Sequence, residues 1–157
     1  MNFAILNAKE KAVRLTGTGL SSSDLLGSWY LQTVWSKGDQ NANQFSSWIL
    51  RSLDARLEIE ADLEDKSSDL LLSNAINLGP IELKFQGPGL LKGKRPLLTF
   101  HFDSLTLRVG GIVLLKKTLP TPNQKRTPFF ALIDRNPDGW MAARGRGGGL
   151  ALWTLKD

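Results

Sequence analysis

The sequence predicts a mainly β protein built as a single antiparallel β-barrel with a short N-terminal helix. Short apolar segments separated by Gly, Pro, Asn and Asp recur at close spacing and indicate about eight to ten strands, a pattern typical of an antiparallel sandwich or a closed barrel. Residues 53–63 alternate apolar and polar side chains with a strict period of two, which is typical of a strand with one face in a core and one in water. A helix is expected only near the start of the chain.

Length and composition narrow the class of protein. A chain of 157 residues suits one domain with one core, which we divide into an N-terminal helical segment or arm, 1–20, and a barrel domain, 21–157. The absence of cysteine excludes disulfides, a thiol nucleophile and zinc–thiolate sites, and one histidine leaves little scope for a metal centre. No apolar run approaches the roughly 20 residues that cross a bilayer, and no secretory signal precedes the first helix, so we expect a soluble protein.

Charge is unevenly distributed along the chain. Residues 51–69 hold seven acidic and three basic groups, whereas residues 80–126 hold nine basic and two acidic groups. A basic segment of this kind suits anionic lipid head groups, an acidic protein or nucleic acid, although an unevenly charged solvated surface explains it equally well.

Residues 2–15 are predicted to form a helix. Apolar side chains are interspersed with charged ones, and Gly17 and Gly19 fit a C-cap. Such a helix could close one end of a barrel or form an arm that docks on a partner, and the sequence does not decide between the two.

The first strand is predicted over residues 25–35. Gly27 allows a sharp bend because it has no Cβ, and Trp29 then lies across the bottom of the barrel with its ring N–H within reach of a backbone carbonyl. An ordinary core tryptophan is the alternative.

The middle of the chain is punctuated by turn residues. Strands are predicted over 53–63, 70–77, 81–86, 96–102, 105–109 and 112–115. Residues 44–53 fit a helix or a strand, 87–96 form a long loop, and 119–126 form a loop with prolines. A change of apolar parity near 103–104 implies a turn or bulge, and 110–111 favour a hairpin turn.

Seven apolar side chains of these strands are predicted to point into the barrel. They are Leu57, Ile59, Leu83, Phe85, Phe100, Phe102 and Leu107. A barrel of about eight strands is either filled by such side chains or holds one small apolar ligand, and both interpretations remain open.

A surface patch of apolar and basic residues is predicted from two neighbouring clusters. This predicted basic patch comprises Leu90, Leu91, Lys92, Lys94, Arg95, Lys116 and Lys117. If residues 97–109 form one bulged strand, both clusters lie at the same end of the barrel. Apolar residues flanked by cations would enter a head-group layer and meet anionic lipids, or an acidic partner.

The closing part of the chain carries a family resemblance. A strand over 128–134, an Asn-Pro/Asp-Gly turn over 135–139, a strand over 140–144 and a glycine-rich link lead into a last strand over 150–155. Together with the Gly-x-Trp opening, this order resembles the plastid-lipid-associated proteins, or fibrillins, of plastids and cyanobacteria.

Individual motifs support the resemblance and show departures from it. Leu132-Ile133-Asp134 resembles the family's Tyr-Leu-Asp, with Leu132 at the tyrosine position. Arg144-Gly145, followed by Gly148-Gly149-Leu150, resembles the closing Arg-Gly…Gly-Gly-apolar run, whereas Met141 stands where the family has an arginine.

The resemblance implies a lipocalin-like barrel closed by an arginine stacked on the first-strand tryptophan. Gly27, Trp29 and Arg144 are the expected closure residues, with Arg146 as the alternative arginine.

The resemblance also implies a non-enzymatic protein at the cytoplasmic side of a cyanobacterial thylakoid membrane. It would associate peripherally with anionic thylakoid lipids and bind a lipid, an isoprenoid quinone or a carotenoid. The alternative is a self-filled barrel that docks on a photosystem or another photosynthetic membrane complex for assembly, stabilisation or photoprotection.

Other functions find less support in the residues. We identify no catalytic residues, because no second histidine accompanies His101 and no serine lies in a nucleophile-elbow setting. A cofactor requirement, a metal site and nucleic-acid binding are not expected, since the single Arg-Gly stretch at 144–149 fits a hairpin link better than an RNA-binding segment. A bilin-lyase-like role would rest on fold analogy alone.

Overall fold

The computed structural model describes residues 1–41, 55–63, 68–123, 125 and 127–156. Within them the chain forms an α-helix, a short 3-10 turn and ten strands. The elements are α1 (Phe3–Thr16), η1 (Ser22–Leu25), β1 (Gly27–Trp35), β2 (Arg56–Ala61), β3 (Leu70–Leu78), β4 (Ile81–Lys92), β5 (Leu97–Phe100), β6 (Ser104–Val109), β7 (Ile112–Thr118), β8 (Phe129–Asn136), β9 (Trp140–Gly145) and β10 (Leu150–Lys156). The ambiguous segment 44–53 lies outside the described residues.

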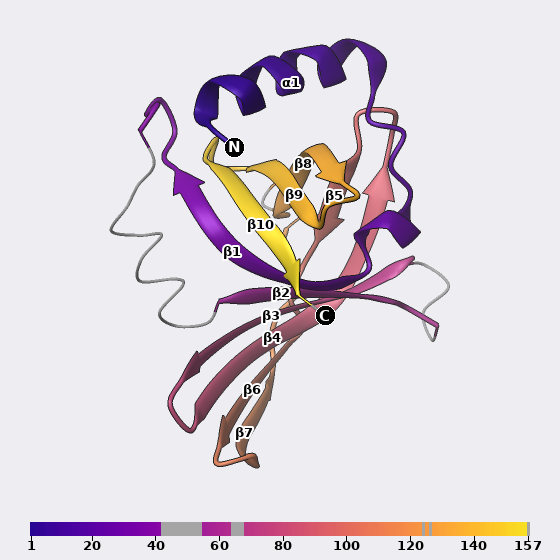
Figure 1. Ribbon diagram of the computed structural model, residues 1–157. Helices are drawn as coiled ribbons and strands as arrows, with labels where there is room; N and C mark the ends of the chain where they lie inside the picture. The colour runs from indigo at the N-terminus through magenta and orange to yellow at the C-terminus, as the bar shows by residue number, and fades with distance from the viewer. Residues whose placement is uncertain (42–54, 64–67, 124, 126, 157) are drawn as a thin grey trace.

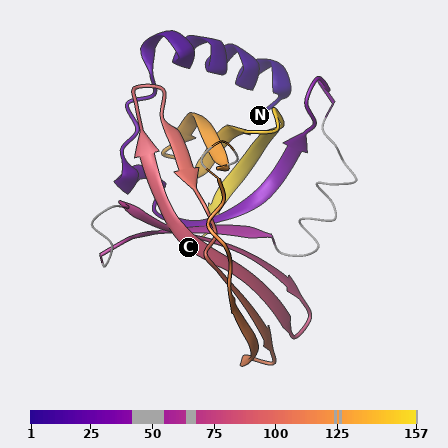
Figure 2. The same cartoon turned by 180° about the vertical axis from the view of Figure 1, so that it is seen from behind.

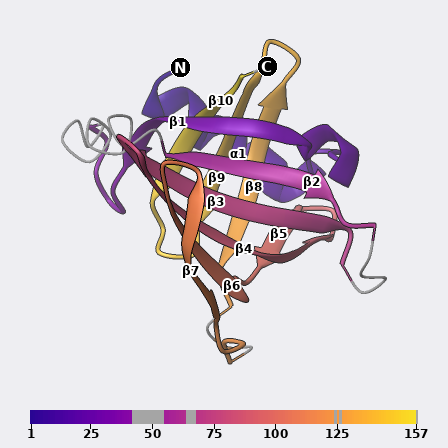
Figure 3. The same ribbon diagram turned by 90° about the horizontal axis from the view of Figure 1, so that it is seen from below.

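Eight of the strands close into an antiparallel barrel, which confirms the predicted fold class. They follow the order β3-β2-β1-β10-β9-β8-β5-β4, and β4 pairs back with β3 to complete the circle. Figure 3 shows β1 to β4 crossing over β8, β9 and β10, so the interior lies between two layers of strands. The barrel is lipocalin-like, with one helix added at the N-terminus.

The strands β6 and β7 extend the sheet beyond the barrel. The first half of β4 pairs with β6 and its second half pairs with β5, so the neighbour of β4 changes along its length. We call β6, β7 and the adjoining residues 74–78 of β3 and 81–86 of β4 the projecting sheet. It points away from α1 in Figure 1, and Figure 2 shows the same arrangement from behind.

The predicted loop 87–96 is too long, because β4 continues to Lys92 and only residues 93–96 form a turn. Pro88 lies where the neighbour of β4 changes, a break in the ladder that accommodates a residue without an N–H. A Cβ on Gly87 would come 2.0 Å from the carbonyl oxygen of His101, so glycine permits the close approach of the β5–β6 connection. Here the glycines mark close packing and not a loop.

Two β-bulges switch which residues face the interior. The register of β1 against β10 shifts between Leu31 and Thr33, so Trp29 packs inside the barrel and Trp35 packs outside it. A second shift, between Leu132 and Asp134 in β8, has the same effect on the residues that follow it.

The helix α1 packs on the outer wall of the barrel, so it neither closes an end nor forms a free arm. Its buried Leu6 joins Trp35, Ile133 and Leu150 in an outer apolar cluster. The helix ends at Thr16, and Gly17, one of the two predicted glycines, is its C-cap; this residue has φ 78° and its N–H donates to the Val13 carbonyl at 2.8 Å.

Candidate functional site

An apolar cavity of about 250 Å³ lies in the barrel at the end opposite Gly27. Its lining residues come from five strands and the residue before β2: Leu31, Val34, Ala55, Leu57, Asn74, Ile76, Phe130, Ala151 and Trp153. Asn74 is the single polar residue among them, and its side chain is exposed. A mostly apolar concave wall with one amide suits an apolar molecule that carries a polar end.

The predicted interior residues divide into three groups. Leu57 lines the cavity, whereas Ile59 and Phe100 are buried in the packed core of the barrel. Phe102 packs against that core from the connection between β5 and β6. Leu83, Phe85 and Leu107 are half-buried on the projecting sheet, with Leu83 opposite Leu107 across β4 and β6.

Aromatic rings connect the projecting sheet with the cavity. Phe85 contacts Phe102 with ring centroids 5.8 Å apart, and the series continues through Phe100 and Phe130 to Trp153, with centroids 5.1–5.5 Å apart. The interior apolar face is therefore continuous from the projecting sheet to the cavity wall.

Sequence reasoning missed most of the cavity wall. Trp153 faces Leu31 across β10 and β1, and both alternate regularly with outward residues, so their parity was a usable signal. Val34 faces the cavity only because the bulge in β1 shifts the register, and no residue type in this strand predicts that bulge.

At the opposite end, Trp29 is fully buried and held by its ring edge. Its Nε1–H donates to the carbonyl of Leu25 at 2.7 Å, which confirms the predicted hydrogen bond to a backbone carbonyl. Leu20 and Leu25 pack against the same core cluster, so the segment before β1 covers this end of the barrel.

The predicted pairing of Trp29 with Arg144 is wrong, and Arg146 does not replace it. The guanidinium of Arg135 lies over the Trp29 ring, 5.7 Å from its centroid. Arg144 pairs with Ala131 on the outer face, where it reaches α1, whereas the bulge at Ile133 puts Arg135 inside opposite Met141. Arg146 instead donates to the backbone carbonyls of Lys125 and Thr127.

Arg144 fixes α1 to the barrel through Glu10, which is 2% exposed. Its Nε donates to both carboxylate oxygens at 2.9 Å and its Nη2 donates to Oε2 at 2.6 Å, while Arg14 and Arg95 donate to Oε1 at 3.1 and 3.3 Å. Burial alone would raise the pKa of Glu10, but the hydrogen bonds and charges of Arg144 and Arg14 outweigh it and hold the pKa below its ordinary value.

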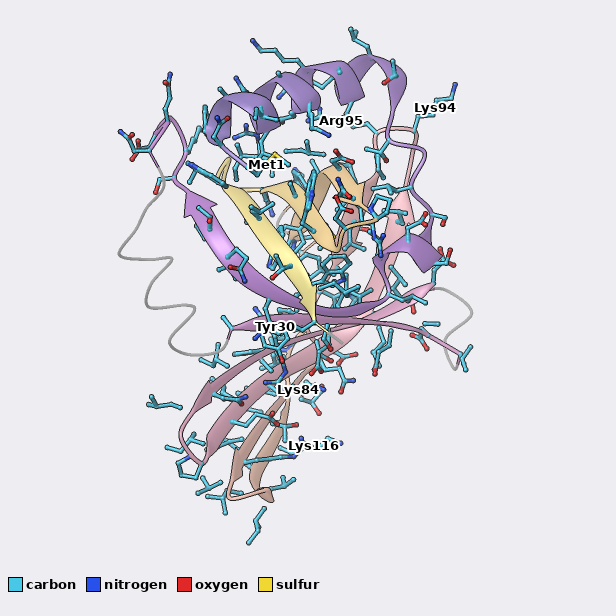
Figure 4. The ribbon with its side chains drawn as sticks, in the orientation of Figure 1. Met1, Tyr30, Lys84, Lys94, Arg95 and Lys116 are labelled. Carbon is cyan, nitrogen blue, oxygen red and sulfur yellow. The ribbon has the colours of Figure 1, made fainter. Side chains whose placement is uncertain are left out.

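The structure separates the two clusters of the predicted basic patch. Figure 4 shows Lys94 and Arg95 beside α1 and Lys116 on the projecting sheet at the other end of the molecule. Residues 97–109 form two separate strands, β5 and β6, which both pair with β4 but have β8 and β7, respectively, as their second neighbour, so the assumption of one bulged strand fails.

The remaining residues of the patch follow the same division. Leu90, Leu91 and Lys92 belong to β4 near Lys94, and the two leucines are half-buried, whereas Lys117 lies beside Lys116 on β7. The apolar residues that accompany Lys116 and Lys117 are those of β7 itself.

A network of ion pairs covers the outer face between β2, β4 and β6. Arg56 bonds Glu58 at 2.8 Å and Glu82 at 2.7 Å, Lys84 bonds Glu58 at 2.7 Å, and Arg108 bonds Glu82 at 3.0 Å. The hydrogen bond from Arg56 is the largest influence on Glu82 and lowers its pKa, while in Glu58 the hydrogen bonds from Arg56 and Lys84 outweigh the effect of burial and lower its pKa. These carboxylates therefore stay charged and paired, and are not arranged as a proton donor and acceptor.

The fold and the cavity define a lipocalin-like β-barrel with an apolar pocket at one end. Among the described residues, no group of three or more His, Cys, Asp or Glu side chains could hold a metal ion, and no helix is long and apolar enough to cross a membrane. Neither a family model, nor a curated protein, nor a solved structure matches the chain.

Proposed function

We propose that this protein is a non-enzymatic lipid-binding barrel that associates peripherally with a membrane. The observation that carries the proposal is the apolar cavity beside Trp153 and Leu31, with Asn74 as its polar group. The resemblance to fibrillins favours the same function and suggests the cytoplasmic side of a cyanobacterial thylakoid membrane.

The size of the cavity indicates which part of a ligand it would hold. Its volume of about 250 Å³ equals roughly eight water molecules at about 30 Å³ each. This space suits one end of an acyl or isoprenoid chain and is too small for a whole carotenoid. The aromatic series from Trp153 to Phe85 packs beside the cavity, and Trp153 and Phe100 in it are already buried by the protein's own side chains, so the rest of a long ligand chain would extend out of the cavity.

Native mass spectrometry of protein purified gently from its own cells tests the proposal. We expect an apolar molecule at one copy per chain that disappears after organic extraction, and we expect Ala151→Phe, which fills the cavity, to lose it. Ala12→Phe, on the exposed side of α1, is the matched control and should retain the molecule.

An empty barrel that co-purifies with a membrane protein complex would contradict the lipid-binding function. That result would support the alternative in which a self-filled barrel docks on a photosynthetic complex.

A further inference from the structure

The projecting sheet exposes apolar side chains that no described element covers. Leu78 and Ile81 flank the β3–β4 turn with exposed fractions of 62% and 41%, and every residue of β7 is exposed. In β7 the exposed apolar residues are Ile112, Val113, Leu114 and Leu115, at 49–68%. The two neighbouring hairpins thus end in one apolar tip. A contiguous apolar patch of this kind is unfavourable in water and typically marks an interaction site.

We infer that this tip is the membrane-docking surface of the protein and that its occupant is the head-group layer of an anionic bilayer. The inference rests on the proposed membrane association and assigns it to these residues. Residues 76–81 and 109–115 contain no charged side chain. Lys116 and Lys117 follow directly behind them, about 13–16 Å from Ile112 at roughly 3.3 Å per strand residue.

Both faces of β7 show the same order from tip to base. Cross-strand partners share a face, so Ile112, Leu115 and Lys117 lie on one face with Val109, Leu107 and Leu105. Val113 and Lys116 lie on the other face with Arg108 and Thr106. Within β7, the apolar side chains therefore lie nearer the tip than the two lysines on both faces, as a layered medium requires. On β6, Arg108 lies opposite Val113, and its charge is paired with Glu82 at 3.0 Å.

A second protein surface would not require this arrangement. A copy of the chain or another partner would cover one face or one edge of β7, so only that side would need to be apolar. Charge also favours lipid, because Glu58 and Glu82 are already paired within the outer network, while Lys116 and Lys117 add two cations outside it. Anionic head groups would complement these cations.

The free edge of β7 limits how deeply the tip inserts. β7 is the last strand of the sheet within the described residues, so one row of its backbone N–H and C=O groups has no neighbouring strand among them. Such groups are costly in hydrocarbon but are satisfied among head groups and water. We therefore expect the tip to bind at the membrane interface. Ile112 and Leu114 would lie below the lipid phosphates, and Lys116 and Lys117 would lie at the level of the phosphates.

Vesicle flotation tests the surface with matched variants. The probes are vesicles of phosphatidylcholine, with and without phosphatidylglycerol. We expect Ile112→Ser with Leu114→Ser to weaken binding by about tenfold or more, and Lys116→Gln with Lys117→Gln to weaken it about 10–30-fold on the anionic vesicles alone. The controls are Leu15→Ser, at a leucine of α1 that is 89% exposed, and Lys92→Gln with Lys94→Gln at the opposite end; both should bind as wild type.

A fluorescent label locates the contact directly. The chain has no cysteine, so Ile112→Cys and Leu15→Cys each give one attachment site for an environment-sensitive dye. We expect the emission at residue 112, and not at residue 15, to shift to the blue when anionic vesicles are added. Circular dichroism checks that each variant is folded.

Three results would overturn the inference. If both double variants, Ile112→Ser with Leu114→Ser and Lys116→Gln with Lys117→Gln, bind vesicles as wild type does, the membrane contact lies elsewhere on the protein. The proposed function would not be contradicted by that result. If wild-type protein does not bind anionic vesicles, membrane association is contradicted in the proposed function as well. Ligand binding in the cavity is measured independently by mass spectrometry. A blue shift that grows with protein concentration without lipid, together with a dimer in sedimentation, would assign the tip to a second copy.

Discussion

Trp29 is fixed by both the edge and the face of its ring. The edge donates a hydrogen bond to the carbonyl of Leu25, and the face lies under Arg135. The Nε of Arg135 is buried and has no hydrogen-bond partner in the part of the chain that the structure describes. A guanidinium that is short of acceptors gains from the electron-rich face of an indole. The contact therefore stabilises the closed end of the barrel and helps to compensate for placing a cation inside it.

A double-mutant cycle tests this contact against the pairing expected from the family resemblance. We expect Trp29→Phe and Arg135→Met to be coupled by about 0.5–1 kcal/mol in the free energy of unfolding, measured with urea. The matched cycle of Trp29→Phe with Arg144→Met should show no coupling, because Arg144 lies on the outer face. Coupling to Arg144 and none to Arg135 would contradict the geometry.

At this scale, sequence reasoning succeeded where the chemistry is local. Gly27, Trp29 and the hydrogen bond of the indole could be predicted because they depend on residues within a few positions. The arginine partner could not be predicted, since the bulge at Ile133 decides whether Arg135 or its neighbours face inward. A shift of one residue in register exchanges the two faces of a strand.

Among the elements, α1 depends on one buried carboxylate. Glu10 accepts hydrogen bonds from three arginines, and Lys9 pairs with Asp134 nearby. The pKa of Glu10 is lowered in the folded protein, so its contribution to stability is present above the ordinary value of 4.5 and is lost as the pH falls through the folded pKa.

Replacement of this carboxylate should weaken the attachment of the helix. We expect Glu10→Gln to lower the free energy of unfolding by about 2–3 kcal/mol at pH 7, because the arginines lose their charged acceptor. The loss should be smaller at an acidic pH below the folded pKa of Glu10, which lies under the ordinary value of 4.5, because the wild-type carboxylate is itself protonated there. Glu60→Gln, on the exposed part of β2, is the control and should change little; an equal loss at both pH values would contradict this role of Glu10.

The elements themselves could be predicted to different degrees. The helix, its Gly17 cap and the hairpin turn at Gly110 and Gly111, with φ 56° and 81°, follow from local signals. The strand β4 was interrupted in the prediction because glycine and proline usually mark loops. The position of α1 on the outer wall depends on Trp35 and Ile133 facing outward, which the bulges determine.

For the whole molecule, the change of neighbour along β4 has the largest consequence. It sends β6 and β7 beyond the barrel, moves Lys116 away from Lys94 and leaves an apolar sheet that continues the barrel interior. The number and period of the strands predicted a sandwich or a closed barrel, and the resemblance at the two ends of the chain favoured the barrel. The separation of Lys94 from Lys116 at opposite ends of the molecule could not be predicted, because no sequence pattern indicates which strand pairs with each half of β4.

A bound lipid with an acyl chain should stabilise the whole barrel, because a ligand that binds only the folded state shifts the unfolding equilibrium toward that state. Protein refolded from denaturant without lipid is the starting point, and lauric acid is the probe. We expect the melting temperature to rise by about 5–10 °C at roughly 100 times the dissociation constant. Ala151→Phe should abolish the rise because its ring occupies the cavity, whereas Ala12→Phe should preserve it. An equal rise in both variants would mean that lauric acid stabilises the protein from outside the barrel, and the cavity would then have no part in binding it.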